Sequence, residues 1–577
     1  MSQLDWIVLV VTLLAIITYG LYKSRTSHNL DGYFLSNRSM PWGLVLLSIM
    51  GTQASAITFL AAPGQAYTEG MGFVQYYFGL PLAMVVICIF FVPIFNKLKV
   101  YTAYEYLENR FDGKTRTLTS FLFLLQRGLS TGISVFAPSI ILSSLLGWNI
   151  YWTNLFMGGL LIIYTMTGGA KAVAYTQQLQ LLIIFIGMFL AGYMVVNMLP
   201  ANVGFTDALK VSGELGRLNV IDSGITKNGI DWSGKYNLLS GIIGGFFLAL
   251  SYFGADQSQV GRYLTARSVG ESKMGLIMNG IVKIPMQFLI LLVGALVFTF
   301  YQFNKAPLFF NDKQVTKIEN SPLRDSFRMA NAEYNLLSGN KESTVIAYAK
   351  ALDEDDQAEK QRLGSELKTL QVRSDSIRKK VKTWIGSGVV GGDDNDTNYI
   401  FLRFVVDYLP AGLVGLLIAI IFIASWGSIA AAINSLASCS MVDFHRRFTK
   451  NIDTGEDEYR LSKVYTLGWG IFCIVVAMFT YNIGNSLIEA VNILGSLFYG
   501  VILGVFLVAF FFKKITNGNA VFWGALLAEL LVLTVYLLTQ TKPAVINMGF
   551  LWLNPIGAFG VIIFTLLLNK AMPRQAR

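Results

Sequence analysis

Long apolar runs recur along the whole of this 577-residue chain, and each is long enough to cross the hydrocarbon core of a lipid bilayer. That core is roughly 30 Å thick, which a helix of about 20 apolar residues spans. Hydrophobic residues make up 54% of the sequence and charged residues only 14%, too few to cover the surface of a water-soluble protein this long. The sequence therefore predicts an all-α polytopic membrane protein with about 13 transmembrane helices.

The apolar runs also give approximate limits for these helices. We place them near 5–22, 41–68, 73–96, 117–146, 150–168, 172–199, 237–258, 274–303, 405–440, 463–482, 487–511, 519–540 and 550–569. The first run follows Asp5 and precedes Lys23 and Arg25, which reverses the charge order of a secretory signal, so we expect a retained span.

Basic residues follow the odd-numbered spans, which places them all on one side of the membrane. They are Lys23, Arg25 and Arg38; Lys97, Lys99, Arg110, Lys114 and Arg116; Lys171; Arg262, Arg267 and Lys273; Arg446, Arg447 and Lys450; Lys513 and Lys514; and Lys570, Arg574 and Arg577. Positive charge marks cytoplasmic loops, so this predicts a bacterial-type inner (plasma) membrane protein with its N-terminus outside and its C-terminus in the cytoplasm. The net charge of +10 reflects topology, and we expect no nucleic-acid partner.

Ten spans remain when the first and the last two are set aside, and ten divides into two units of five. A unit with an odd number of spans inserts its second copy upside down, which gives a five-plus-five inverted-repeat transporter core. The predicted parts are a first span and lead-in (1–40), a first repeat (41–199), an extracytoplasmic loop (200–236), a second repeat (237–511) interrupted by a charged extracytoplasmic helical insertion (305–398), and two additional C-terminal spans (512–577). The insertion contains a soluble helical stretch at 354–382, and a lid over the transport path is an alternative role for it.

Weak helix formers interrupt the first span of each repeat. The segments are 48–56, with Gly51, Gln53 and Ser55, and 251–257, with Gly254 and Asp256. Unwound backbone inside a membrane persists only against protein or water. Small residues explain close helix packing, but Gln53 and Asp256 need another explanation. We therefore expect broken helices here and treat these two side chains as candidates for substrate binding.

Arg127 lies near the middle of the fourth predicted span. It shares a helical face with Ser130, Thr131 and Ser134, at intervals of three, four and seven residues. An arginine inside a membrane costs several kcal/mol unless it is paired or hydrated, so function is the default interpretation. A structural salt bridge, for instance with Glu489, is the alternative.

Two classes of function find little support in the sequence. Only two histidines occur, and the three cysteines, Cys88, Cys439 and Cys473, all fall in apolar runs, so no catalytic cluster is indicated and we do not expect an enzyme. A membrane sensor module remains a weaker alternative, because the chain ends at Arg577, shortly after the last span. The expected partners are a small solute and the lipid bilayer, with no protein partner required.

Several motifs in order resemble the sodium:solute symporter family, which includes sodium/glucose, proline, pantothenate and sialic acid carriers. They are Asp31–Ser39 with the run to Ala66, Gly168–Val173, Gly254–Leu264, Pro410–Leu417, and Ala432–Ser435 leading to Asp443. The resemblance covers most of the membrane part and leaves out 305–398. It implies the five-plus-five fold, alternating access, and symport of a small organic solute.

The resemblance also implies a sodium site between the first broken helix and the ninth span. The family's carbonyl ligands correspond to Gly51, Ala54 and Ala424, and its paired hydroxyls correspond to Gly427 and Ser428. Only Ser428 keeps a hydroxyl, and Gln177 stands where the family usually has an aspartate. Na⁺ is the expected coupling ion, and a proton-coupled or uncoupled carrier is the alternative.

Substrate contacts in the family correspond to Gln53, Ser55 and Thr58, with Gln75 and Arg127 as further candidates. Sialic-acid-type members carry an arginine in the helix equivalent to that of Arg127. A carboxylated solute, such as a sialic acid or a monocarboxylate, is therefore slightly favoured over a neutral sugar or polyol.

The predicted topology can be tested with single cysteines. A cysteine in place of Ser338, in the insertion, should react with a membrane-impermeant maleimide in intact spheroplasts, and a cysteine in place of Ser24 should react only after lysis. The reverse labelling pattern would invert the predicted orientation.

Overall fold

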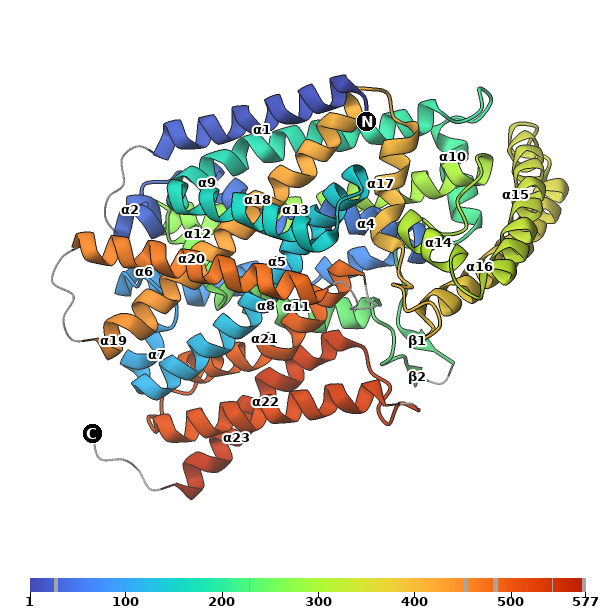
Figure 1. The fold of residues 1–577 in the computed structure, drawn as a ribbon. Coiled ribbons are helices and arrows are strands. Elements are labelled where there is room, and N and C mark those ends of the chain that lie inside the picture. The colour runs from blue at the N-terminus through green and yellow to red at the C-terminus, as the bar shows by residue number, and fades with distance from the viewer. Residues whose placement is uncertain (25–29, 228, 450–454, 481–485, 542, 573–577) are drawn as a thin grey trace.

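The computed structural model describes residues 1–24, 30–227, 229–449, 455–480, 486–541 and 543–572, and it consists mainly of long helices that run side by side (Figure 1). The first half contains α1 Gln3–Ser24, α2 Leu30–Leu35, α3 Trp42–Gln53, α4 Ala56–Glu69, α5 Leu80–Val86, α6 Val92–Leu98, α7 Glu105–Arg110, α8 Gly113–Leu146, α9 Ile150–Asn197, α10 Phe205–Glu214, α11 Gly245–Gly254 and α12 Gln257–Tyr263. The second half contains α13 Val269–Phe303, α14 Asp312–Glu319, α15 Arg324–Asp353, α16 Gln357–Gly386, α17 Thr397–Tyr408, α18 Leu413–Cys439, α19 Arg446–Phe448, α20 Gly455–Phe479, α21 Leu487–Phe511, α22 Gly518–Gln540 and α23 Leu553–Ala571. A short antiparallel pair, β1 Ile225–Thr226 and β2 Gly229–Ile230, lies in the loop before α11.

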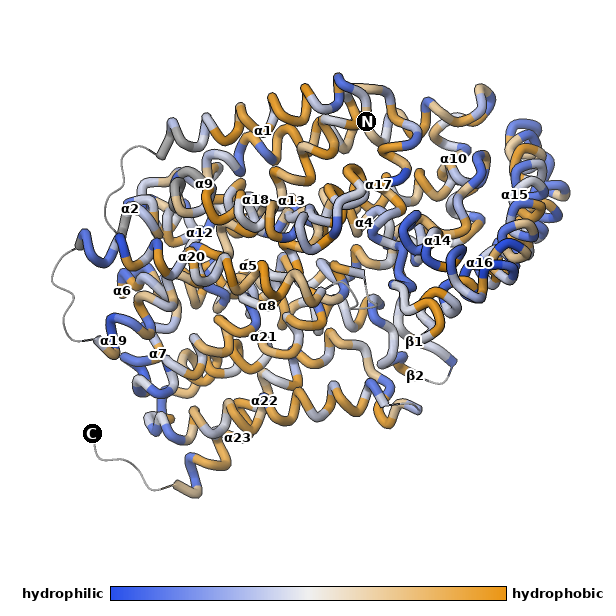
Figure 2. Tube along the Cα trace, viewed as in Figure 1, coloured by the Kyte–Doolittle hydropathy of each residue, from blue (hydrophilic) through white to orange (hydrophobic). Residues whose placement is uncertain are grey.

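The predicted all-α polytopic fold is confirmed. Ten described helices are long and apolar enough to cross a membrane, and α3 with α4 forms an eleventh, bent span. Two shorter apolar helices, Ile150–Met166 and Ser240–Gly254, complete a one-to-one match with the predicted spans. Figure 2 shows hydrophobic residues along the length of the bundle and hydrophilic residues gathered at its two ends and on α15 and α16.

The ninth span differs from its predicted limits. Instead of starting near 405, it starts at Leu413, and α17 is a separate helix that ends at Tyr408. Pro410 lies between them, and Gly412 has a φ of 90°, which a helix cannot contain. The span continues as a π-helical turn, Ser440–His445, into α19.

The 48-residue helix α9 contains both the fifth and the sixth predicted spans. The hydroxyl oxygens of Tyr164 and Thr176 lie 2.6 Å apart. In a straight helix, twelve residues would separate the two Cα atoms by about 18 Å, which is beyond the reach of these side chains. The element therefore bends sharply between Tyr164 and Thr176, so it forms two arms.

Both predicted helix breaks are present. The chain leaves helical geometry between Gln53 and Ala56, where α3 and α4 are bent by 61°, and again between Gly254 and Gln257, where α11 gives way to α12. At the second break, the Asp256 side chain accepts a hydrogen bond of 2.7 Å from the backbone N–H of Ser258. This capping interaction satisfies one of the donors that the start of a helix leaves free.

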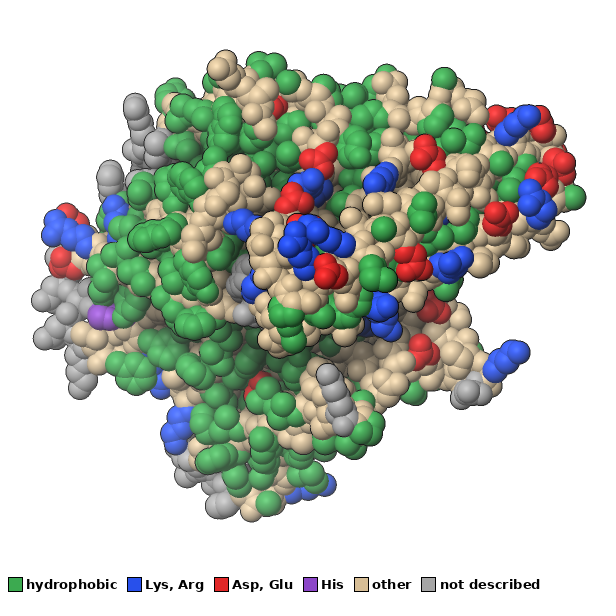
Figure 3. All heavy atoms as spheres, turned by 45° about the vertical axis from the view of Figure 1, so that its right-hand side comes forward, with side chains coloured by type: hydrophobic (Ala, Val, Ile, Leu, Met, Phe, Trp, Pro, Cys, Tyr) green, Lys and Arg blue, Asp and Glu red, His purple; other side chains and the backbone are tan. Residues whose placement is uncertain are grey.

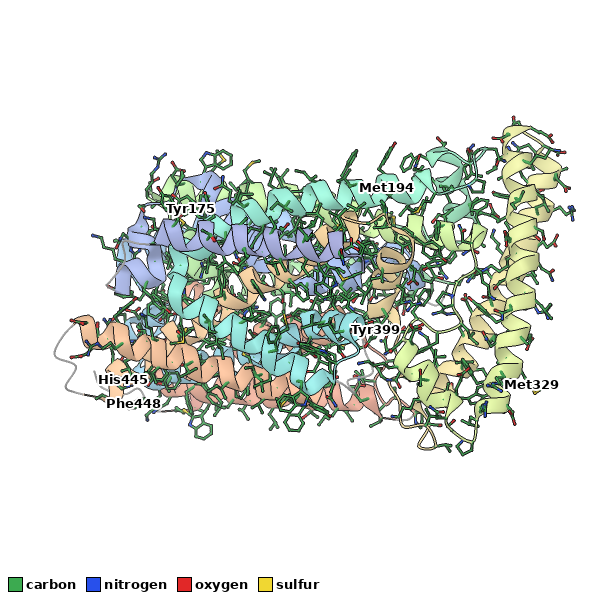
Figure 4. All side chains as sticks on the ribbon, turned by 45° about the horizontal axis from the view of Figure 1, so that its top comes forward. Tyr175, Met194, Met329, Tyr399, His445 and Phe448 are labelled. Carbon is green, nitrogen blue, oxygen red and sulfur yellow. The ribbon has the colours of Figure 1, made fainter. Side chains whose placement is uncertain are left out.

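The segment between α13 and α17 forms the predicted helical insertion. Figures 1 and 4 show α15 and α16 as a hairpin across one end of the bundle, with Met329 on it, while His445 and Phe448 mark the opposite end. The hairpin has a small apolar core of its own, made by residues that include Phe327, Leu337, Val381 and Ile385. Figure 3 shows that the acidic and basic side chains on the visible face gather over this region, while the bundle beside it is mainly hydrophobic.

Asp396, just before α17, anchors the hairpin to the bundle. Its buried carboxylate lies 2.8 Å from both Arg378 and Lys382 of α16, and it accepts a hydrogen bond from the backbone N–H of Phe310. Burial raises the pKa of the Asp396 carboxyl, but Arg378 and Lys382 outweigh burial and hold that pKa below its usual value. The carboxylate therefore stays charged in the folded protein.

Asp396→Asn should loosen the hairpin. It leaves Arg378 buried beside Lys382 without their shared carboxylate, and the loss of one partner from a buried ion pair costs about 3 to 5 kcal/mol. We expect a lower melting temperature and faster proteolysis within 305–398. Asp355→Asn, which removes the exposed pair between Asp355 and Lys360, is the control and should change neither measurement appreciably. Equal behaviour of the two variants would contradict the anchoring role.

Candidate functional site

A cavity of about 150 Å³ lies at the first helix break, between α3, α4, α8, α11, α13, α18 and α21. The polar lining residues are Thr52, Gln53, Ser55, Thr58, Tyr76, Tyr77, Gln126, Arg127, Ser130, Thr131, Ser134, Tyr252, Lys283, Ser428, Asn492 and Tyr499. Both helix breaks contribute to this region, because Asp256 contacts two of the lining residues. The tertiary structure thus brings the polar residues of separate spans to one place.

Arg127 enters this cavity from α8 and lies close to Asp256. Its Nη1 atom is 4.0 Å from Asp256 Oδ2, and its guanidinium carbon is 5.8 Å from the centre of the Tyr252 ring. Asp256 is already engaged: Oδ1 accepts hydrogen bonds from the backbone N–H and the hydroxyl of Ser258, and Oδ2 accepts one of 2.6 Å from the Tyr499 hydroxyl. Within the described residues, Nε of Arg127 has no hydrogen-bond partner, so the guanidinium keeps donors available for a ligand.

The alternative pairing of Arg127 with Glu489 is wrong. Glu489, in the first turn of α21, lies 2.6 Å from Lys235 instead, which belongs to the loop before α11. The carboxylate beside Arg127 comes from the second helix break, where Asp256 also caps α12.

Lys283 is a second cation at the cavity, and sequence reasoning missed it. It lies on α13 and is almost fully buried, with its Nζ atom 5.4 Å from the centre of the Tyr77 ring. No described carboxylate lies within 4.0 Å of this amine. The signal in the sequence was the same as for Arg127, because Lys283 is a charged residue inside a long apolar run.

The neutral candidates fall into two groups. Gln53, Ser55 and Thr58 line the cavity, and Oε1 of Gln53 has no hydrogen-bond partner among the described residues. Gln75 is not among the residues that line the cavity; its amide donates to the carbonyl of Tyr236 at 3.0 Å and accepts from the backbone N–H of Asp222 at 3.1 Å. The structure places Gln75 in a loop-bracing role, contrary to its selection as a substrate contact.

The residues that the resemblance assigns to sodium lie where α3 and α18 approach α9. Because α3 ends at Gln53, carbonyl groups of its last turn have no intrahelical donor. Ser428 lines the cavity, and the fully buried Ser425 hydroxyl has no partner in the described part of the chain. These are oxygen atoms, the ligands that a hard cation prefers.

Gln177 joins these elements by hydrogen bonds. Its amide oxygen accepts from Ser48, and its amide nitrogen donates to the Thr52 hydroxyl and to the carbonyl of Gly427. A Cβ atom at position 427 would clash with Oε1 of Gln180, at the end of a flexible side chain. A serine at position 427 would therefore have to displace the Gln180 side chain.

Comparison with known proteins agrees with this architecture. The sequence model of the sodium:solute symporter family matches residues 33–320 and 380–528. The sodium/sialic acid symporter NanT of Aliivibrio fischeri is 24% identical over 97% of this chain and 92% of its own length. The sodium/sialic acid symporter SiaT of Proteus mirabilis is 25% identical over 90% of this chain and 86% of its own length.

The fold also matches a solved structure. A substrate-bound, outward-open structure of a Na⁺-coupled sialic acid symporter superposes with a TM-score of 0.73 and 22% sequence identity, over 99% of this chain and 98% of that one. The sequence model covers most of the chain and both helix breaks. The chain belongs to the sodium:solute symporter family, and it is an integral membrane protein that moves a small solute by secondary active symport with sodium.

Proposed function

We propose that this transporter carries a small carboxylated organic solute, taken up with Na⁺ by alternating access across a bacterial-type inner membrane. The observation that carries the proposal is the charge of the central cavity. Arg127 and Lys283 both line it, while the nearby Asp256 carboxylate already accepts hydrogen bonds from Ser258 and Tyr499. The basic loops support a cytoplasmic C-terminus and an insertion on the outer side.

A carboxylate suits this cavity on electrostatic grounds. Arg127 and Lys283 outnumber the single nearby carboxylate, and an uncompensated charge is costly in a region of low dielectric constant, so a bound anion would stabilise the charged form of Lys283. The planar guanidinium of Arg127 can hold a carboxylate with two parallel hydrogen bonds, and the amine of Lys283 adds a point charge. Two of the relatives are named as sodium/sialic acid symporters, and sialic acids carry a carboxylate.

The neutral lining residues suit the rest of such a solute. Gln53, Ser55 and Thr58 lie at the helix break, and Asn492 faces the same cavity from α21. Amides and hydroxyls both donate and accept, so they can pair with the hydroxyl or amide groups of a polar solute. Asp256 acts through Arg127 in this proposal, because it fixes the position of the guanidinium.

For sodium we propose the carbonyl oxygens of Gly51, Ala54 and Ala424 together with the hydroxyl of Ser428. Gly427 contributes no hydroxyl, and its carbonyl is already held by Gln177. Of the four proposed sodium ligands, the Ser428 hydroxyl is the one side-chain oxygen. In this structure it donates a hydrogen bond to the carbonyl of Ser425. Sodium binding here would join α3 to α18 beside the substrate cavity.

The role of Arg127 and Lys283 in substrate binding can be tested by measuring uptake of radiolabelled N-acetylneuraminate into proteoliposomes. Arg127→Lys keeps the charge and loses the planar fork, so apparent affinity should fall about tenfold or more, roughly 1.4 kcal/mol. Arg127→Gln should nearly abolish uptake, and Lys283→Met should weaken it strongly. Lys273→Met makes the same change on α13 outside the cavity and should leave uptake unchanged.

Melting temperatures separate binding from folding in these variants. If Arg127 is structural, both of its variants will melt at clearly lower temperatures than the parent. Normal transport of a neutral sugar by Arg127→Gln would rule out the carboxylate proposal and favour a sugar or polyol, with Gln53 and Thr58 as hydroxyl-binding residues.

The sodium site is tested by the sodium dependence of the same uptake. Ser428→Ala removes a ligand and should raise the sodium concentration for half-maximal uptake severalfold. Ser435→Ala is the control, because its hydroxyl bonds within α18 and lies outside the cavity. Gly427→Ser should restore a ligand and lower that concentration once Gln180→Ala makes room. If the rate of uptake does not depend on sodium concentration in the parent or in any variant, transport is proton-coupled or uncoupled.

A further inference from the structure

A second cavity, of about 200 Å³, lies between the insertion hairpin and the end of the bundle. Its walls come from α15 and α16, from the ends of α4 and α13, and from Arg217 in the loop after α10. The family match omits 321–379, which includes all of α15 and most of α16. This cavity is therefore built in large part by a segment that the family pattern does not contain.

The cavity is rich in positive charge. Five cationic side chains line it: Arg217, Lys341, Arg378, Lys379 and Lys382. Asp396 pairs with Arg378 and Lys382, and Asp375 lies 3.8 Å from Arg217. Among the described residues, no carboxylate lies within 4.0 Å of Lys341 or Lys379. The acids at the cavity thus leave part of the positive charge uncompensated.

The surroundings of Lys341 indicate that this excess positive charge is energetically unfavourable. Its side chain is buried, and among the described residues its amine donates only to the neutral Gln371 amide, at 2.7 Å. Burial is the main cause that lowers the pKa of Lys341 to about 8; Asp375 opposes this shift, and Arg378 and Arg217 add to it. The surroundings therefore disfavour the charged amine, and a bound anion would reverse that effect.

Unused hydrogen-bonding groups lie at the same cavity. Within the described part of the chain, the Nε–H of Arg217 and the hydroxyl of Tyr301 are buried without a partner, as is the amide oxygen of Gln302. A buried polar group without a partner costs about 1 to 3 kcal/mol. Two of these groups can donate to an anionic oxygen, and the third can accept from a hydroxyl.

We propose that this cavity is a second binding site for a small carboxylate-bearing, hydroxylated solute, formed jointly by the hairpin and the bundle. Thr68 lines it, while Thr58 lines the central cavity, and both are on α4. Ten helical residues span about 15 Å, so the second site lies about that far from the first along α4. That its ligand is also the transported solute rests on the proposed function; binding of a carboxylate here does not.

Binding can be measured on purified full-length protein carrying Arg127→Gln, which removes the main cation of the central cavity. N-acetylneuraminate and inorganic phosphate are titrated separately by calorimetry in sodium-free choline chloride of constant ionic strength. We expect saturable binding of N-acetylneuraminate that weakens at least fivefold in Lys341→Met and is retained in Lys341→Arg. Lys350→Met makes the same change on the exposed side of α15 and should not alter binding.

Equal affinity in Lys341→Met and Lys350→Met would overturn the proposal. Phosphate binding that N-acetylneuraminate cannot compete away would assign the cavity to inorganic anions and overturn it as well. Lys341→Met removes a buried charge that lacks a carboxylate, so its melting temperature without ligand should not fall; if it does not fold, Arg217→Gln provides the same test. If the parent transports no carboxylate, N-acetylneuraminate included, but the second site still binds N-acetylneuraminate, the proposed function is contradicted and the second site is not.

Discussion

The carboxylate of Asp256 connects the fold of this transporter to its central cavity. A membrane interior offers no water to the backbone, so a helix can be interrupted there only if other groups bond the freed donors. Asp256 accepts hydrogen bonds from the first turn of α12 with one oxygen and from the Tyr499 hydroxyl with the other, and this second oxygen lies 4.0 Å from Arg127. The same carboxylate thus stabilises the second helix break and positions the Arg127 guanidinium at the cavity.

Gln177 plays a comparable role where α9 meets α3 and α18. Its amide makes hydrogen bonds to both helices. A neutral amide can link these helices without a bound cation, whereas a carboxylate would need one nearby. The Gly51 and Gly427 backbones permit this close approach.

The insertion adds a charged structure to an otherwise apolar molecule. Its two long helices share a small core, and the buried Asp396 ties them to the start of α17 through Arg378 and Lys382. The family-matched segments continue on both sides of it, so the hairpin is accommodated without interrupting the transporter core. Its basic inner face at the end of α4 gives the bundle a second polar chamber beyond the central one.

The sequence by itself determined the number of spans, both helix breaks, the helical insertion and the family, because these follow from local composition and from motifs in order. It also identified Arg127, since a charge in an apolar run is visible without any contacts. Only the tertiary structure decided what such residues touch. Arg127 lies beside Asp256 and not Glu489, and Lys283 lines the cavity from α13. The Gln75 side chain bonds the loop before α11. These partners are more than a hundred residues apart in the chain, and how the helices pack, rather than local propensity, selects which of them meet.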